Sequence, residues 1–300
     1  MLSINIPVYN IEVADLVAEL IEQGNALKLP FEIRVYDDGS QEVVKEKNRK
    51  LKAEPSVVYV ELPENLGRAG IRNRMGEESK YKYLLFIDAD SAILSGNYLK
   101  NYLDAAKPGE VLCGGTAYRS DKPAEPEKLL RWTYGINREA ISATHRNSAK
   151  GFIITSNNFL IDRDVFERIH FREELKAYGH EDTLLGYDLH RNNIVIRHID
   201  NPLEHTGLED AAAFLTKTRT ALENLKNIAA GMVDYDDVFT VQVAFLRKYG
   251  NITNYVPGAL FRFIYKTANR LMERNLKGKN PLLFVFDLYK LSYFAQIKNR

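Results

Sequence analysis

The pattern of apolar and polar positions predicts alternating strands and helices through the first 90 residues. Apolar segments typical of buried strands, each followed by polar turn residues, lie at 2–6, 31–36, 57–62 and 83–88. Helical signals separate them: the apolar spacing from Val13 to Ile21 stops at Gly24, Ser40 can cap a helix over 41–52, and small residues at 65–73 lead into a third helix. This alternation predicts an α/β domain with a mostly parallel central sheet.

The pattern is looser after Asp90. We predict a helix at 97–106, a helix from Tyr178 through His190, and a loop-like middle region that includes the Lys- and Pro-rich stretch 119–128. Short strands are predicted at 111–113, 152–154, 159–161 and 194–199. Beyond Glu209 the pattern is almost entirely helical. The predicted organisation is an α/β domain over residues 1–210 and a helical region over 211–300 that packs on it.

Composition fits this organisation and limits the class of partner. The chain has 300 residues, 45% of them hydrophobic, which is enough for a sizeable core, and its net charge of +1 gives no argument for a nucleic-acid partner. Charge is unevenly distributed: residues 257–300 carry nine Lys or Arg against Glu273 and Asp287, a net +7, so residues 1–256 carry −6. The tail is therefore a basic segment.

Cysteine content and the first residues bear on the compartment. Cys113 is the only cysteine, so no intramolecular disulfide can form, and no Cys or His cluster has the spacing of a structural zinc site. The first residues lack the basic and apolar regions of a signal peptide, and no apolar run reaches membrane-spanning length. We expect a cytoplasmic protein.

Two carboxylates end the fourth predicted strand. Asp88-Ala89-Asp90 follows the apolar run at once, and parallel sheets bind ligands at the carboxyl ends of their strands. Carboxylates this close repel one another unless a cation or hydrogen-bond donors neutralise them, so a divalent metal ion is one explanation. The other is a turn in which Asp acts as a helix cap. The pattern alone leaves both open.

Six short motifs in a fixed order resemble a known enzyme family. They are Ile6-Pro7-Val8-Tyr9-Asn10, Asp37-Asp38-Gly39-Ser40, Asn65-x-Gly67 with Arg72-Asn73, Asp88-Ala89-Asp90, Gly179-His180-Glu181-Asp182 and His205. Their order and spacing over roughly the first 210 residues resemble the family 2 inverting glycosyltransferases, which have the GT-A fold. The rest of the chain lies outside the resemblance.

The resemblance implies a role for each motif. Asp182 would be the base that removes the acceptor hydroxyl proton, Asp90 and His205 would bind Mn²⁺ or Mg²⁺, and Glu181 would orient the acceptor. Trp132, which lies outside these motifs, is a further residue that we expect to orient the acceptor. The residues that would hold the nucleotide-sugar donor are Pro7, Tyr9, Asp37, Asp38, Asn65, Gly67, Arg72 and Asp88. A departing nucleoside diphosphate develops negative charge, which a bound divalent ion neutralises well.

Three of these assignments have rivals in the sequence. Arg68 lies one turn before Arg72 on the same helix face and can take its role. His198 competes with His205 as a metal ligand. Asp182 can instead cap the helix that follows it.

The resemblance also implies the kind of substrate. It implies a UDP-sugar donor and a glycan or lipid-linked glycan acceptor. The chain lacks the Gln-x-x-Arg-Trp run of processive polysaccharide synthases, so we expect one hexosyl or N-acetylhexosaminyl transfer per encounter. We expect acceptor contacts within residues 115–160, where Trp132 and Tyr134 can stack on a sugar face, although core packing is the alternative for Trp132.

Two other classes of protein stay open. A sugar-phosphate nucleotidyltransferase shares a related α/β plan but should show a Gly-rich phosphate loop after the first strand, where this chain has Pro7-Val8-Tyr9-Asn10. A non-catalytic nucleotide-sugar-binding protein is the other class. The joint presence of Asp90, Glu181 and Asp182 argues against it.

The basic tail predicts an amphipathic helix. Arg262, Lys266, Arg270 and Arg274 recur every four residues, beside apolar positions on other faces of the same predicted helix. A second, strongly apolar helix follows. We expect either that these helices rest on the anionic inner face of a membrane or that they form a pair that covers the α/β domain.

Overall fold

The computed structural model describes residues 1–149, 151–174, 178–231 and 237–297. Its centre is a seven-stranded sheet with the strand order β3-β2-β1-β4-β8-β6-β9. These strands are β1 (Leu2–Val8), β2 (Phe31–Asp37), β3 (Val57–Glu61), β4 (Tyr83–Ile87), β6 (Val111–Cys113), β8 (Asn158–Asp162) and β9 (Ile196–His198). β8 runs antiparallel to β4 and β6, and the other neighbours are parallel. The sheet is therefore mostly parallel, which confirms the predicted α/β class.

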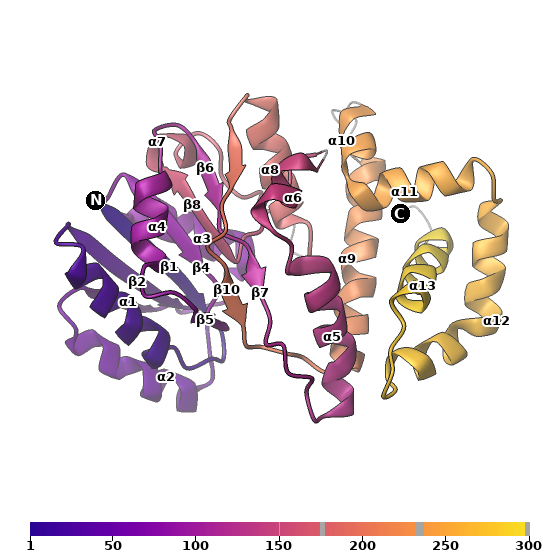
Figure 1. Ribbon diagram of the computed structural model, residues 1–300, viewed down its shortest axis with the longest axis horizontal. Helices are drawn as coiled ribbons and strands as arrows, with labels where there is room; N and C mark the ends of the chain where they lie inside the picture. Colours follow the sequence, from indigo (N-terminus) through magenta and orange to yellow (C-terminus); the bar gives the residue numbers. More distant parts are fainter. Residues whose placement is uncertain (150, 175–177, 232–236, 298–300) are drawn as a thin grey trace.

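Helices cover both faces of this sheet and give three layers (Figure 1). One face is covered by α1 (Ala14–Ala26), α4 (Tyr98–Ala105) and the segment after α2 (Glu42–Asn48), and the other by α3 (Gly67–Glu78), α7 (Arg163–Phe166) and α8 (Glu181–Arg191). Because side chains alternate across a strand, β4 sends Leu85 and Ile87 to the first face and Leu84 and Phe86 to the second. Both faces of β4 are therefore buried, as its continuous apolar run predicts.

A second, three-stranded sheet joins segments that are far apart in the sequence. Its strands are β5 (Ser91–Ile93), β7 (Thr116–Ala117) and β10 (Leu203–His205), with β10 in the middle. β10 pairs antiparallel with β5 in a register that sets His205 opposite Ser91, and it pairs in parallel with β7. The segment after β9 is thereby held beside the residues that follow Asp90.

The helical region forms a layer on the far side of α8. Its helices are α9 (Ala211–Gly231), α10 (Asp237–Gln242), α11 (Ala244–Thr253), α12 (Gly258–Leu276) and α13 (Leu283–Gln296). α9 packs on α8 through a cluster that includes Tyr187 and Leu225, while α12 and α13 pack on α9 and on α5 (Leu129–Tyr134) through Leu215, Met272 and Tyr289 (Figure 1). Within the described part of the chain, no helix combines the length and hydropathy needed to cross a bilayer.

Two predicted helix boundaries are wrong. α1 continues past Gly24 to Ala26. Gly24 makes room for the Phe31 ring, since a Cβ there would lie 2.5 Å from it, and it does not end the helix. Ser40 does not cap α2, since its hydroxyl accepts the Asn10 N–H at 2.7 Å. Asn10 Oδ1 accepts the N–H of Gln41 instead, at 2.8 Å.

The middle of the chain also differs from the prediction. Residues 152–154 do not form a strand, and Phe152 packs against the rings of Tyr187 and Phe239. The region expected to be loop-like contains α5, a π-helical turn (Gly135–Glu139) and α6 (Ala143–Ser148). These helices are too short for apolar periodicity to identify them.

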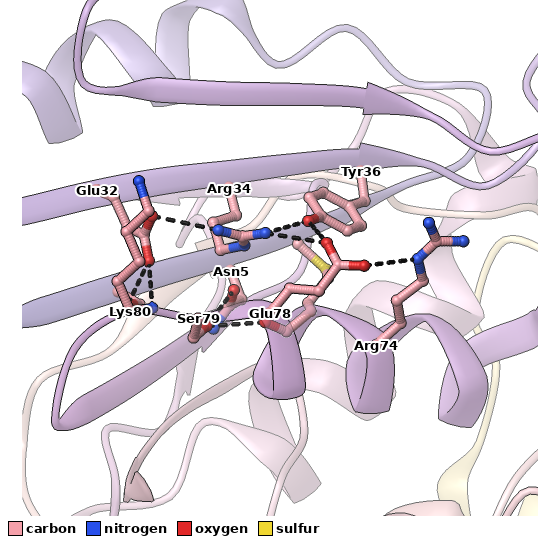
Figure 2. Close-up of polar contacts among 10 residues, drawn as sticks. Asn5, Glu32, Arg34, Tyr36, Arg74, Glu78, Ser79 and Lys80 are labelled. Atoms are coloured by element: carbon pink, nitrogen blue, oxygen red, sulfur yellow. Dashed lines mark hydrogen bonds and ion pairs between the residues drawn. The ribbon is translucent and has the colours of Figure 1, made fainter.

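A buried polar cluster fastens α3 to the sheet (Figure 2). Glu32 and Arg34 of β2, each 5% exposed, form an ion pair of 3.2 Å, and Arg34 also contacts Glu78 at the end of α3 at 3.1 Å. Ser3 donates a hydrogen bond of 2.7 Å to Glu32. Charges buried in this way are tolerated only when they are paired and hydrogen-bonded. The cluster holds the C-terminal end of α3, whose N-terminal end lies at the site described next.

Candidate functional site

The carboxyl ends of β1, β2 and β4 meet at one edge of the sheet, because these neighbouring strands are parallel. A cavity of about 540 Å³ lies there. Seven of the eight residues predicted to hold a donor line it: Pro7, Tyr9, Asp38, Asn65, Gly67, Arg72 and Asp88. We call it the donor-side cavity. Asp90, Arg68, Tyr178 and Lys217 line it as well.

The two neighbouring acids after β2 have different surroundings. Asp37 is fully buried and is absent from the cavity lining; its Oδ1 accepts the N–H groups of Gly39 (3.1 Å) and Ser40 (2.7 Å). Asp38 lines the cavity, and its carboxylate accepts the N–H groups of Leu66 (2.7 Å) and Gly67 (3.1 Å). Burial raises the pKa of Asp38. Asp37 therefore shapes its own turn, and Asp38 ties the start of α3 to β2.

Two arginines of α3 neutralise acids at this edge. Arg72 is 2% exposed and forms an ion pair with Asp88. Arg68 lies one turn earlier, with its side chain 43% exposed, 3.8 Å from Asp88 and 2.5 Å from Glu181. Arg72 is thus committed to Asp88, whereas Arg68 keeps an accessible surface.

The small sheet brings His205 to Asp90. Because His205 pairs with Ser91, its Nδ1 lies 3.5 Å from Asp90 Oδ2, and the next residue, Thr206, donates its N–H to the Asp90 carbonyl at 2.8 Å. Burial acts to raise the pKa of Asp90, but the contact with His205, a hydrogen bond from its own backbone N–H and the charge of Arg68 together outweigh burial, so the pKa is lowered. The two predicted metal ligands therefore lie together.

The rival histidine lies elsewhere. His198 is buried on β9 and lines a different cavity from Asp90, with its Nδ1 3.2 Å from the Arg146 guanidinium. Burial, and then the charge of Arg146, lower the pKa of His198 to about 4. A fixed cation at this distance disfavours a metal ion there.

A second cavity, of about 440 Å³, adjoins the first. It shares Arg68, Asp88, Asp90, Tyr178 and Lys217 with the donor-side cavity, whereas Asp182 and His205 line this cavity and not the donor-side one. We call it the acceptor-side cavity. The two spaces therefore meet at the acid pair after β4.

The acids that begin α8 carry opposite pKa shifts. Burial, and then the charge of Glu181, raise the pKa of Asp182 to about 6. For Glu181 burial acts in the same direction, but Arg68, a hydrogen bond from its own backbone N–H and the charge of Arg72 together outweigh burial, so the pKa is lowered. Asp182 is therefore a stronger base than an ordinary aspartate and is still ionised at neutral pH, which suits proton abstraction.

The turn before α8 decides the capping question. The helix begins at Glu181, and its N-cap is His180, a left-handed residue with a φ of 72°. Asp182 lies inside the first turn and its Oδ1 accepts the Thr183 N–H at 2.7 Å. The alternative of a capping Asp182 before a helix over 183–190 is therefore wrong.

The two predicted sugar-stacking aromatics lie outside both main cavities. Trp132 donates its indole N–H to the Arg119 carbonyl at 2.9 Å and lines a third cavity, which shares Tyr118 and His205 with the acceptor-side cavity. Tyr134 packs on Phe214 and Phe286 in the cluster beneath α9. Trp132 thus borders the acceptor side, and Tyr134 is a packing residue.

Sequence reasoning missed two residues that line both cavities. Lys217 of α9 lies over the Tyr178 ring at 5.4 Å and forms an ion pair with Glu209. Tyr178 directly precedes the motif at 179–182, so its position was a usable signal. Nothing in the sequence around Lys217 sets it apart from the other cations of the helical region.

Asp90 and His205 fit a divalent ion whose remaining coordination positions are filled by phosphate and water. Among the described residues, no group of three or more His, Cys, Asp or Glu side chains could hold a metal ion alone. Asp90 and His205 offer the oxygen and nitrogen donors that Mn²⁺ accepts, and Mg²⁺ and Mn²⁺ commonly take further ligands from phosphates and water. Since Arg72 occupies Asp88, Asp90 is the carboxylate left for a cation.

Comparisons with known proteins identify the family and the fold. A family model described as glycosyl transferase family 2 matches residues 3–170. A solved structure of the mannosyltransferase PcManGT from Pyrobaculum calidifontis, in complex with GDP-Man and Mn²⁺, is 14% identical, with 98% of this chain and 85% of that chain covered and a TM-score of 0.61. TarS 1–349 of S. aureus in complex with UDP is 17% identical, with 98% and 89% covered and a TM-score of 0.50. At these identities the likeness shows a shared fold. No curated protein matches the chain.

Proposed function

This chain belongs to glycosyl transferase family 2 and has the GT-A fold, and we propose that it transfers a sugar, with inversion, from a nucleoside diphosphate donor to a hydroxyl of a glycan or lipid-linked glycan. The observation that carries the proposal is the pair of cavities that meet at Asp88 and Asp90, with Asp182 on one of them only. Donor and acceptor would enter separately and meet at the carboxylates.

The donor would lie in the donor-side cavity. Asp38 and Asn65 offer polar groups to a nucleoside there, and Arg68 and Lys217 are the cations placed to face its diphosphate. One structural neighbour is described with GDP-Man and another with UDP, which supports a nucleotide-sugar. We propose a UDP-sugar, as the resemblance of the motifs implies.

Asp90 and His205 would hold Mn²⁺ or Mg²⁺ beside the diphosphate. When bound, the ion would neutralise the charge that develops as the nucleoside diphosphate departs. The chain's own contribution is to keep Asp88 paired with Arg72, so that one of the two neighbouring acids remains available.

Asp182 would act as the base on the acceptor side. The acceptor oxygen attacks the anomeric carbon opposite the diphosphate, the bond from that carbon to the diphosphate oxygen breaks, and the hydroxyl proton passes to the Asp182 carboxylate. Thr183 N–H bonds Oδ1 and fixes the carboxylate in place. Glu181, which forms an ion pair with Arg68, would orient the acceptor. We propose one transfer per encounter.

The first experiment identifies the donor. Nucleotide-sugars are screened by thermal shift with and without Mn²⁺, because a ligand that binds only the folded state raises the unfolding temperature. We expect one nucleotide-sugar to raise it in a Mn²⁺-dependent manner. No shift with any nucleotide-sugar would count against the proposal.

The second experiment tests Asp182. Asp182→Asn should keep the thermal shift with the donor and lower the transfer rate by about 10²- to 10⁴-fold, the usual contribution of a positioned base. Asp104→Asn, whose carboxylate lies on the surface of α4, is the matched control and should transfer normally. Near-normal turnover by Asp182→Asn would remove Asp182 from the mechanism.

A further inference from the structure

The outer side of α12 and the start of α13 present large apolar side chains to solvent. They are Leu260 (48% exposed), Phe263 (62%), Leu271 (67%), Leu282 (44%) and Phe284 (67%). Among the described residues, six of the sixteen exposed large hydrophobic residues fall within residues 255–284, a tenth of the chain. Apolar exposure is therefore concentrated in this segment, which is typical of an interaction site.

Cations are interleaved with these apolar residues. Arg262, Lys266, Arg270 and Arg274 are exposed, and none of them forms an ion pair with another residue of the described chain. Residues 255–284 contain six Lys or Arg and one acid, Glu273, a net +5. Glu273 is itself held by Arg219 (3.4 Å) and Lys277 (2.7 Å). The four α12 cations thus have no acidic partner within the protein's described part.

Helix geometry gathers both kinds of residue on one side of α12. Phe261, Met272 and Leu276 are buried against α9, α11 and α13, so the helix face opposite them points away from the protein. Figure 1 shows α12 at the outer edge of the molecule, at the end opposite α1 and α2. We call this surface the α12 face: Leu260, Phe263 and Leu271 together with Arg262, Lys266, Arg270 and Arg274.

We propose that the α12 face docks on the surface of a lipid bilayer that contains anionic phospholipids. Leucine and phenylalanine side chains gain by entering the boundary between headgroups and acyl chains, while Lys and Arg beside them contact lipid phosphates. An anionic bilayer therefore contacts both the apolar residues and the cations of the α12 face. The inference does not depend on the proposed glycosyl transfer.

Other occupants match only part of the face. A second copy of the chain docked through the same face would bring its four cations, Arg262, Lys266, Arg270 and Arg274, against the same four, which is repulsive. A nucleic acid would satisfy the cations but offers no apolar environment for Leu260 and Leu271. An acidic protein remains a partner that the experiment below distinguishes.

The experiment measures co-sedimentation of the full chain with vesicles of phosphatidylcholine alone and of phosphatidylcholine mixed with phosphatidylglycerol. We expect at least about tenfold stronger partitioning to the anionic vesicles, weakened by added salt. Two double variants test the two components of the face: Phe263→Ser with Leu271→Ser, and Arg270→Gln with Arg274→Gln. Each should lower binding to the anionic vesicles by about tenfold or more.

Controls separate docking from folding. Val43→Ser (65% exposed in the parent protein) and Lys50→Gln, at the end of the molecule that carries α2, should bind as the parent does. All variants should keep the parent's thermal midpoint, since the changed side chains are exposed. Equal partitioning of the parent to both kinds of vesicle, unchanged binding by both α12 double variants, or binding to RNA or an acidic protein in place of vesicles would each overturn the proposal.

Discussion

Replacing Asp182 with asparagine should stabilise the folded protein at neutral pH. Burial, and then the charge of Glu181, raise the pKa of Asp182 from its ordinary value of 3.8 to about 6. The folded state therefore holds this proton more tightly than the unfolded state does, and ionised Asp182 lowers the free energy of unfolding. An uncharged side chain of the same shape removes that cost. Asparagine also keeps an Oδ1 that can accept the Thr183 N–H.

The size of the effect follows from the pKa difference. About two pKa units at about 1.36 kcal/mol each give about 3 kcal/mol. Below about pH 3 the carboxyl is mostly protonated in both states and costs little. As the pH rises, the unfolded state ionises first and the cost grows until the folded pKa, near 6, is passed. Asp182→Asn should therefore be more stable than the parent by about 3 kcal/mol at pH 8 and by about half of that at pH 5.

Urea unfolding of both proteins at pH 5 and pH 8 measures this difference directly. Asp104→Asn, which removes an exposed carboxylate with a side chain 62% accessible, controls for the loss of one negative charge. The same preparation of Asp182→Asn should be inactive in transfer. A stabilisation of equal size at both pH values, or a loss of stability at pH 8, would refute the reasoning.

Three further predictions concern the metal site and the buried ion pairs. His205→Ala should raise the Mn²⁺ concentration needed for half-maximal transfer by about tenfold or more, and an unchanged metal titration removes His205 from the site. Gly207→Ala would place a Cβ 2.5 Å from Asp90 Oδ2, so it should weaken Mn²⁺-dependent donor binding by about tenfold. Gly96→Ala, which has open space around it, is the control and should not weaken this binding. Equal donor binding by the two variants would contradict the expected clash. Arg34→Met strips the guanidinium from the cluster of Figure 2 and leaves Glu32 buried, so urea unfolding should show a loss of about 3 kcal/mol or more; a loss below about 1 kcal/mol would mean that the pair is not effectively buried.

Local sequence patterns predicted the central sheet well because each of its parallel strands carries its own signal. β4 is buried on both faces, so its apolar run is continuous, and the acids that follow it reach the sheet edge whatever the rest of the chain does. The carboxyl ends of β1, β2 and β4 then coincide by topology alone. For this reason Pro7, Tyr9, Asp38 and Asp88, four of the seven expected donor residues that line the cavity, lie together.

The failures occur where long-range contacts decide the outcome. Ser40 has the usual sequence signature of a helix cap, but its hydroxyl accepts a hydrogen bond from the backbone N–H of Asn10, thirty positions earlier. Phe152 lies in an apolar triplet whose pattern predicts a strand, but in the structure its ring packs against Tyr187 of α8 and Phe239 of α10. Neither partner could be found from local spacing.

The position of His205 also depends on a long-range contact that the local sequence does not show. His198 and His205 have equal claims in the sequence, and the three-residue strand β10 distinguishes them by pairing with β5 more than a hundred residues earlier. Strands this short have no periodicity to detect. The resemblance to the family selected His205, and the structure supplies the physical reason why it lies beside Asp90.

Two arginines four residues apart on α3 divide the acids of this site. Arg72 pairs with Asp88, and Arg68 pairs with Glu181, which lowers the pKa of that glutamate. Asp90 and Asp182 are left, with pKa values shifted in opposite directions: lowered for Asp90, which suits binding of a cation, and raised for Asp182, which suits acceptance of a proton. Because α3 also contributes to the boundary between the two cavities, the pairing of its arginines would set the proposed division between metal binding and base catalysis.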